Sequence, residues 1–201
     1  MEKNKFQIKR EETYRRLIEK GMEIFLQKGY AKTKIDDIAK AAGYTRGAFY
    51  FHFESKEDFF MHAMRGYNTT RVEWEKLPYQ LDPEKLSLEE VLKASFTTLM
   101  NSMHGVGSGW IILFVDFYQH IKHDEKITSE LKAIQRNFED ALIKFLDALQ
   151  DRGFISSSIN TREAALQTIM VTYGYMINYY VFDQKDLDLL IQGQMKILSG
   201  E

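Results

Sequence analysis

The chain has 201 residues, of which 44% are hydrophobic and 28% are charged, a composition typical of folded globular proteins and not of disordered ones. It contains no cysteine, which excludes disulfide bonds, thiolate metal sites and cysteine nucleophiles. No apolar run approaches the roughly 18 residues that span a bilayer, and the N-terminal segment MEKNKFQIKREE lacks the apolar core of a signal peptide, so we expect a cytoplasmic protein with no membrane partner.

The net charge of −2 is unevenly distributed along the chain. Residues 1–56 hold 13 basic and 8 acidic residues, whereas residues 57–201 hold 14 basic and 21 acidic residues. A basic N-terminal part favours a polyanionic partner for that part of the chain alone. A chance excess of solvated surface charge is the alternative, and charge by itself leaves it open.

Apolar residues at spacings of three and four predict a first helix over about residues 9–28, which Gly29 ends. A second helix is expected to begin after Thr33, its predicted N-cap, with Asp36 three residues later in a capping-box arrangement. Gly43 ends this helix, and because glycine adopts positive φ readily it suits a tight turn.

Thr45 is the predicted N-cap of a third, very short helix that runs to about Phe51. Only two or three residues then separate the second and third helices, which is the spacing of a helix-turn-helix. Ser55 is expected to cap a fourth helix, which connects the two parts of the chain over about residues 56–75. The two prolines of the chain then interrupt the helical pattern.

Beyond the prolines, strand signals are scarce and helical spacing continues to the end of the chain. We therefore predict an all-α fold, with an N-terminal three-helix helix-turn-helix domain over residues 1–56 and a C-terminal helical domain over residues 57–201. The helices of the second domain are expected near residues 87–104, 109–121, 124–151, 161–182 and 185–198.

The segment TKIDDIAKAAGYTRGAFYFHFESK, from Thr33 to Lys56, resembles the DNA-binding signature of the TetR family of transcription regulators. The likeness lies in small residues at the helix crossing, a glycine in the turn, the TRG opening of the third helix, and the FYFHF and SK that follow. It is close over about residues 11–62 and extends to the remainder only in length and helical layout. The resemblance implies a homodimeric regulator in which the C-terminal domain binds a small-molecule effector.

The opening of the third helix suits entry into the major groove of DNA, because Arg46 can reach guanine while Gly47 and Ala48 add little bulk. Tyr50 and His52 can donate hydrogen bonds to phosphate oxygens, and lysines and helix N-termini favour the same anions. The predicted DNA-binding residues are Thr33, Lys34, Thr45, Arg46, Gly47, Ala48, Tyr50, His52 and Lys56. The neighbouring side chains expected in the core instead are Phe49, Phe51 and Phe53.

The last two long helices are expected to pair with those of a second copy in a four-helix interface, as the resemblance implies. Two apolar stripes support this expectation, and a core within one chain is the alternative for both. The stripes comprise Ala164, Thr168, Val171, Thr172, Tyr175 and Tyr179 on one helix, and Leu187, Leu190, Ile191, Gln194 and Leu198 on the other.

The middle helices are rich in aromatic and methionine side chains, which suit a pocket for an apolar or aromatic effector. An ordinary packed core is the alternative. The predicted effector-binding residues, with His104, Tyr173 and Asn178 as polar anchors, are Met100, Met103, His104, Trp110, Phe114, Phe117, Tyr118, Phe138, Met170, Tyr173 and Asn178.

Asp116, His120 and His123 share a helical face that could hold a metal ion, but a solvated surface is the favoured interpretation, so we predict no metal and no cofactor. The sequence has no nucleophile elbow and no cofactor fingerprint, which argues against an enzyme. We predict a repressor that a small apolar or aromatic effector releases from a palindromic operator in double-stranded DNA. An activator of the same fold and a helical protein-interaction module with a basic head remain as alternatives.

Overall fold

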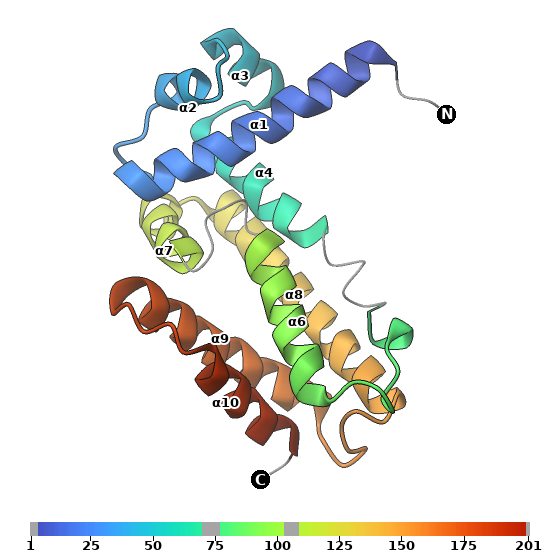
Figure 1. Cartoon of the computed structure of the whole chain (residues 1–201). Helices are drawn as coiled ribbons and strands as arrows, with labels where there is room; N and C mark the ends of the chain where they lie inside the picture. Colours follow the sequence, from blue (N-terminus) through green and yellow to red (C-terminus); the bar gives the residue numbers. More distant parts are fainter. Residues whose placement is uncertain (1–3, 70–76, 103–108, 200–201) are drawn as a thin grey trace. The chain divides into compact units, whose positions relative to one another are not determined.

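The computed structural model describes residues 4–69, 77–102 and 109–199, which contain helices and no β-strand and so confirm the predicted all-α fold. No helix within those ranges is both long and apolar enough to cross a membrane. The predicted continuation of the fourth helix to residue 75 lies outside the described residues. The helices labelled in Figure 1 are α1 (Lys5–Lys28), α2 (Ile35–Ala41), α3 (Arg46–His52), α4 (Lys56–Thr69), α6 (Leu88–Ser102), α7 (Trp110–Ile121), α8 (Glu125–Asp151), α9 (Thr161–Val181) and α10 (Leu187–Ser199).

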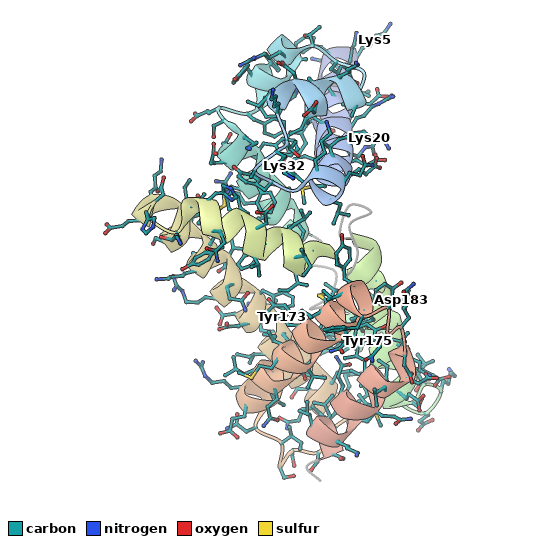
Figure 2. All side chains as sticks on the ribbon, turned by 90° about the vertical axis from the view of Figure 1, so that its left-hand side faces the viewer. Lys5, Lys20, Lys32, Tyr173, Tyr175 and Asp183 are labelled. Atoms are coloured by element: carbon teal, nitrogen blue, oxygen red, sulfur yellow. The ribbon has the colours of Figure 1, made fainter. Side chains whose placement is uncertain are left out.

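The chain divides into two compact units. The head unit comprises α1, α2, α3, α4 as far as Gly66, and α7 with the start of α8 up to Thr128. The body unit comprises α6, the rest of α8, α9 and α10. The expected division at residue 56 put α7 in the C-terminal domain, whereas the structure groups it with the head unit. Figure 2 labels Lys5, Lys20 and Lys32 on the head unit, and Tyr173, Tyr175 and Asp183 on the body unit.

Side-chain caps begin the short helices of the head unit. Thr45 Oγ1 accepts the backbone N–H of Ala48 at 3.2 Å, and Ser55 Oγ accepts that of Asp58 at 3.0 Å, so both predicted N-caps are confirmed. The predicted cap at Thr33 is wrong: Lys34 is the N-cap of α2, and the Thr33 hydroxyl donates to the carbonyl of Gly29 at 2.7 Å. Because the helix begins one residue later than predicted, the acidic partner of the cap is Asp37 and not Asp36. The Asp37 carboxylate accepts the backbone N–H of Lys34.

Aromatic rings from α1, α3 and α4 fill the core of the head unit. Phe25, Phe49, Phe53 and Phe59 are at most 1% exposed, and the ring centroids of Phe53 and Phe59 lie 4.8 Å apart. Gly21 of α1 faces this cluster, and a Cβ at that position would lie 2.9 Å from Cε1 of Phe59. The absence of a side chain therefore lets α1 and α4 pack closely enough to support α2 and α3.

Two residues of α7 attach this helix to the rest of the head unit. Phe117 is fully buried and stacks on Phe60 of α4 with ring centroids 4.2 Å apart. Its ring also meets the edge of Tyr30, at a centroid distance of 5.0 Å. The Asp116 carboxylate accepts the backbone N–H of Tyr30 at 2.6 Å, so α7 holds the loop that leads into α2 by both packing and a hydrogen bond.

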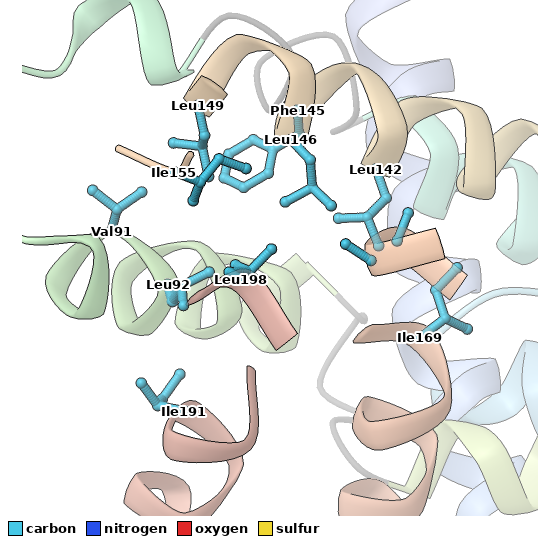
Figure 3. Packing of buried hydrophobic residues seen from close by; sticks show 12 residues of the cluster. Val91, Leu92, Leu142, Phe145, Leu146, Leu149, Ile155, Ile169, Ile191 and Leu198 are labelled. Atoms are coloured by element: carbon cyan, nitrogen blue, oxygen red, sulfur yellow. The ribbon is translucent and has the colours of Figure 1, made fainter. Parts of the chain in front are cut away.

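Mostly aliphatic side chains, from four helices and the loop between α8 and α9, form the core of the body unit (Figure 3). The buried cluster comprises Val91, Leu92, Leu142, Phe145, Leu146, Leu149, Ile155, Ala164, Ala165, Ile169, Ile191 and Leu198. Helices α9 and α10 lie side by side, with the Gln194 side-chain N–H donating to Thr172 Oγ1 at 3.2 Å between them (Figure 1).

Much of both stripes predicted for a dimer lies buried within this chain. The buried members are Ala164, Thr168 and Thr172 of α9 and Leu190, Ile191, Gln194 and Leu198 of α10. For these residues the alternative expectation, a core within one chain, describes the structure. The physical reason is that the body unit uses these faces to pack its own helices together.

Candidate functional site

A tight turn joins α2 to α3. Gly43 has φ of +78°, and the N–H of Tyr44 donates to the carbonyl of Ala39 at 2.8 Å. The Thr45 cap follows at once, so α3 begins at Arg46. The helix-turn-helix predicted from residue spacing is therefore present.

Helix α3 has a buried face and an exposed face. Phe49 and Phe53 lie in the head core, whereas Tyr50 is 45% exposed. A Cβ added at Gly47 would meet only Thr45 Oγ1, at 3.7 Å, which is an ordinary van der Waals distance. Nothing in the described structure requires glycine there, so its small size leaves room for a partner outside the chain. Of the predicted DNA contacts, Ala48 is half-buried and the exposed ones are Lys34, Thr45, Arg46, Gly47 and Tyr50.

The Arg46 guanidinium is engaged with two neighbours on the surface of the head. Its Nη1 lies 3.4 Å from the Asp36 carboxylate of α2, and its Nη2 donates to the Tyr50 hydroxyl at 3.3 Å. The hydrogen bond to Tyr50 and the charge of Asp36 raise the pKa of Arg46 above its usual value. Arg46 is thus held charged at the opening of α3, bound to a carboxylate that a base edge or a phosphate can replace.

Two predicted DNA contacts have roles inside the head. The Lys56 ammonium donates to the carbonyls of Tyr30 and Thr33, at 2.8 and 3.1 Å, and lies 4.2 Å from the centroid of the Tyr30 ring. Burial lowers the pKa of Lys56 below its usual value. Thr33 is only 2% exposed. The side chains of Lys56 and Thr33 therefore organise the loop before α2.

His52 lies half-buried at the C-terminal end of α3. Its ring meets that of Tyr14 from α1 at a centroid distance of 5.9 Å. Burial lowers the pKa of His52 below its usual 6.5, and the positive charges of Arg10 and His62 lower it further. The imidazole is therefore mainly neutral near pH 7, with one nitrogen able to donate a hydrogen bond and the other able to accept one.

Phe51 was predicted to be a core residue, and this is wrong because its side chain is 61% exposed. The guanidinium of Arg10, from α1, lies 5.4 Å from the centroid of its ring. Residues four apart share a face of a helix, as Phe49 and Phe53 do, whereas residues two apart do not. Helical spacing could thus have identified Phe51 as a surface residue in the last turn of α3.

A cavity of about 50 Å³ lies in the body unit, between α6, α8, α9 and α10. Two of the predicted effector-binding residues, Phe138 and Tyr173, line it, and the Tyr173 hydroxyl donates to the side chain of Gln135 at 3.1 Å. Sequence reasoning missed the other polar members of the lining, which are Ser95, Thr168, Thr172 and Gln194. Polar residues on the buried face of a predicted helix were the available signal.

The other predicted effector-binding residues do not line this cavity. Trp110 and Phe117 are buried in the head unit, where both stack on Phe60. Phe114 is half-buried, and the exposed members are Tyr118, Met170 and Asn178. The side chain of Met100 and the whole of Met103 and His104 lie outside the described part of the chain. Aromatic and methionine residues occur both around this cavity and in the core of the head unit, so residue type alone did not distinguish the two locations.

Across the described ranges, no group of three or more histidine, cysteine or acidic residues is arranged to hold a metal ion. His120, one of the three residues weighed for such a site, packs its ring against Tyr30 at a centroid distance of 5.2 Å. Its Nδ1 lies 2.7 Å from the carbonyl oxygen of Asp116. These contacts give His120 a place in the packing of α7.

The sequence is similar to known transcription regulators. The model of the family described as "Bacterial regulatory proteins, tetR family" matches residues 17–63. The HTH-type transcriptional regulator YwcC of Bacillus subtilis is 30% identical over 190 residues, which cover 92% of this chain and 83% of that protein. The HTH-type transcriptional repressor BepR of Brucella suis is 25% identical over 193 residues, covering 92% of this chain and 88% of that protein.

Solved structures share the fold. The transcriptional regulator FadR of Bacillus subtilis, solved in complex with stearoyl-CoA, has a TM-score of 0.61 at 17% identity, covering 94% of this chain and 99% of that one. The relatives are named as regulators and not as enzymes, and the relation to YwcC extends well beyond the helix-turn-helix. The chain therefore belongs to the TetR family of bacterial regulatory proteins, and it is a DNA-binding transcription regulator with a helix-turn-helix.

Proposed function

We propose that the protein is a transcriptional repressor that binds a palindromic operator as a homodimer and leaves it when a small molecule occupies the body unit. The observation that carries this proposal is the exposed opening of α3. Arg46, Gly47 and Tyr50 are exposed there, while Phe49 and Phe53 anchor the same helix in the head core.

In this proposal α3 enters the major groove with its N-terminal residues against the base edges. Arg46 exchanges Asp36 for guanine, a bidentate contact that contributes about 1–3 kcal/mol of discrimination. Gly47 allows the backbone to approach the bases. Tyr50, Lys34 and His52 bind phosphates. The side chains of Thr33 and Lys56 act indirectly, by holding the loop before α2 in place.

The second copy is proposed to pair through α9 and α10. Helix α9 carries apolar residues that are exposed in this chain: Met170 is 70%, Ile177 39% and Val181 52% exposed, at spacings of seven and four residues. Gly174 lies on the same stripe, and a Cβ added there would meet no atom within 4 Å. An apolar helical stripe with a small residue at its centre suits an isologous four-helix interface. This face differs from most of the stripes predicted from the sequence.

The effector-binding and dimerisation domain is proposed to occupy residues 57–201, and the DNA-binding domain residues 1–56. The cavity of the body unit supports a ligand-responsive role, as does the stearoyl-CoA bound to the FadR regulator of the same fold. An effector that favours a different dimer arrangement would alter the separation of the two α3 helices, which must be about 34–36 Å to reach successive major grooves. A repressor of this kind acts in the cytoplasm.

The test is selection of a preferred duplex from random DNA, followed by fluorescence anisotropy at several salt concentrations. A palindromic selected site and a steep loss of affinity with salt are expected, because the head would displace counterions from phosphates. Arg46→Ala should relax sequence preference, whereas Lys34→Ala should weaken binding to all duplexes by a similar factor. Lys126→Ala in α8 is a matched control that should change neither.

The same experiment separates the alternatives. A selected pool without symmetry or sequence preference would contradict a DNA-binding repressor and favour the protein-interaction module. In a reporter strain, deletion of the gene should raise expression from a promoter that contains the selected site, whereas a fall in expression would show an activator.

A further inference from the structure

We propose that the cavity of the body unit binds an uncharged, compact and mostly apolar molecule that carries a hydroxyl, phenol or carbonyl group, and that the hydroxyls of Ser95 and Thr168 anchor this group. The inference deepens the proposed function and rests on it in one respect, namely that the occupant of the cavity acts as the effector. The cavity itself and its chemistry stand on the structure of the body unit alone.

Two buried hydroxyls on the cavity wall lack a partner. Ser95, on α6, is 4% exposed and Thr168, on α9, is 8% exposed. Ser95 Oγ and Thr168 Oγ1 are the two buried side-chain polar atoms without a hydrogen bond in the described residues. Buried polar groups in native proteins are usually paired, because an unpaired one keeps the desolvation cost without the compensating bond. A bound molecule with a donor or acceptor group would supply the missing partner.

Two other hydroxyls on α6 do find a hydrogen-bond partner, which is a carbonyl of the helix backbone. Thr97 and Thr98, both exposed on α6, donate to the carbonyls four residues earlier, at 2.8 Å in each case. Ser95 makes no such bond although its position in the helix is equivalent. Its hydroxyl therefore remains able to donate to or accept from a group inside the cavity.

The lining determines the charge of the occupant. None of the side chains around the cavity is acidic or basic. Besides the two unpartnered hydroxyls, the polar members are Tyr173, which donates to Gln135, and the Gln194–Thr172 pair, joined by a hydrogen bond of 3.2 Å. A carboxylate or an ammonium group placed here would lose its water shell without gaining an opposite charge, which is strongly unfavourable. A neutral ligand avoids that cost.

The size of the cavity limits the occupant to a compact molecule. Its volume of about 50 Å³ exceeds the space for one water but is far below the roughly 300–1,000 Å³ of sites for drug-sized ligands. Met176 and Phe96 line the cavity, and a methionine adapts its side chain to ligand shape with little strain. We therefore expect a single ring or a short branched chain to enter as these side chains adjust.

The experiment uses four probes that share one benzene ring and differ in their polar group: 4-methylphenol, toluene, benzoate and benzylammonium. Binding to the full-length protein is measured by isothermal titration calorimetry. We expect 4-methylphenol to bind at least five-fold more tightly than toluene, and both charged probes to bind more weakly than toluene. Tighter binding of benzoate or benzylammonium than of 4-methylphenol would overturn the inference, as would binding of none of the four.

A double variant, Ser95→Ala with Thr168→Val, tests the anchors. It should reduce the affinity for 4-methylphenol at least five-fold and leave the affinity for toluene within two-fold. Because both hydroxyls are unpaired in the free protein, their removal also removes a desolvation cost, so the variant should retain the wild-type helical content and melt at the wild-type temperature or above it. Thr97→Val, on the exposed side of the same helix, is the matched control and should change neither affinity. Unchanged 4-methylphenol binding in the double variant would refute the anchoring role.

Release of the selected DNA site is measured in the same samples. If 4-methylphenol binds as expected and also lowers DNA affinity, both the cavity assignment and its role as an effector site are supported. If it binds without any change in DNA affinity, the effector role fails while the assignment of the cavity stands. DNA binding by a protein that takes up no probe would leave the head function intact and refute the inference drawn here.

Discussion

Replacing Gly21 by alanine tests whether the head unit depends on the close packing of α1 against α4. The added Cβ would lie 2.9 Å from Cε1 of Phe59 and 3.0 Å from Cγ2 of Ile38. Neither side chain can move aside freely, because both are fully buried and the Phe59 ring stacks on Phe49 at a centroid distance of 5.4 Å. Overpacking of this kind costs about 1–3 kcal/mol, whereas alanine in a helix gains about 1 kcal/mol over glycine.

A second glycine allows the two effects to be separated. Gly193 also lies within a helix, and a Cβ there would meet Val171 Cγ1 at 3.6 Å, an ordinary contact. Gly193→Ala shares the gain in helix propensity without the overpacking. The free energy of unfolding of Gly21→Ala should therefore fall about 2 kcal/mol below that of Gly193→Ala, which corresponds to a melting temperature about 4–8 °C lower. Thermal unfolding followed by circular dichroism measures this difference, and equal melting temperatures for the two variants would refute the reasoning.

Three further outcomes follow from individual contacts. Asp36→Asn should raise DNA affinity several-fold at low salt, because it frees Arg46 and removes a negative charge near the phosphates; an anisotropy titration showing the same gain in an Arg46→Ala background would contradict the role of the pair. The pKa of His52 lies below 6.5 in the folded head, so the unfolded chain binds the proton more strongly and the free energy of unfolding should fall as pH drops below 6.5. Urea unfolding at about pH 7.5 and pH 5.5 should show a smaller fall in His52→Gln than in the wild type, and an identical fall would exclude His52 as a cause. Ile177→Asp should convert the proposed dimer to monomer in sedimentation velocity while Lys126→Asp does not, and an unchanged dimer would exclude α9 from the interface.

Local features of the head unit could be predicted because neighbours in the sequence determine them. The caps at Thr45 and Ser55 and the turn at Gly43 each depend on a hydrogen bond or a backbone angle within a few residues. Thr33 fits the same local rule but forms a different bond, because the loop before α2 buries its side chain against the Gly29 carbonyl. The rule identifies residues able to cap a helix, and the packing of the loop decides which of them does so.

The cavity of the body unit is much harder to predict. Aromatic and methionine side chains occur in both cores, so residue type assigned Trp110 and Phe117 to a pocket although both pack in the head unit. Only Phe138 and Tyr173 of the predicted set line the cavity. Its unpartnered hydroxyls belong to Ser95 on α6 and Thr168 on α9. These helices are more than 50 residues apart in the sequence, so no local sequence pattern indicates that the two side chains line one cavity.

By itself the sequence determined the all-α fold, the helix-turn-helix and the family, because helical spacing, caps and the segment from Thr33 to Lys56 are properties of short stretches of chain. Only the tertiary structure decided that α7 packs with the head, that Lys56 holds the loop before α2, and which face of α9 stays exposed. These outcomes depend on contacts between residues far apart in the chain. A helical stripe specifies that a face will be buried, but the partner that buries it is chosen by the packing of the whole unit.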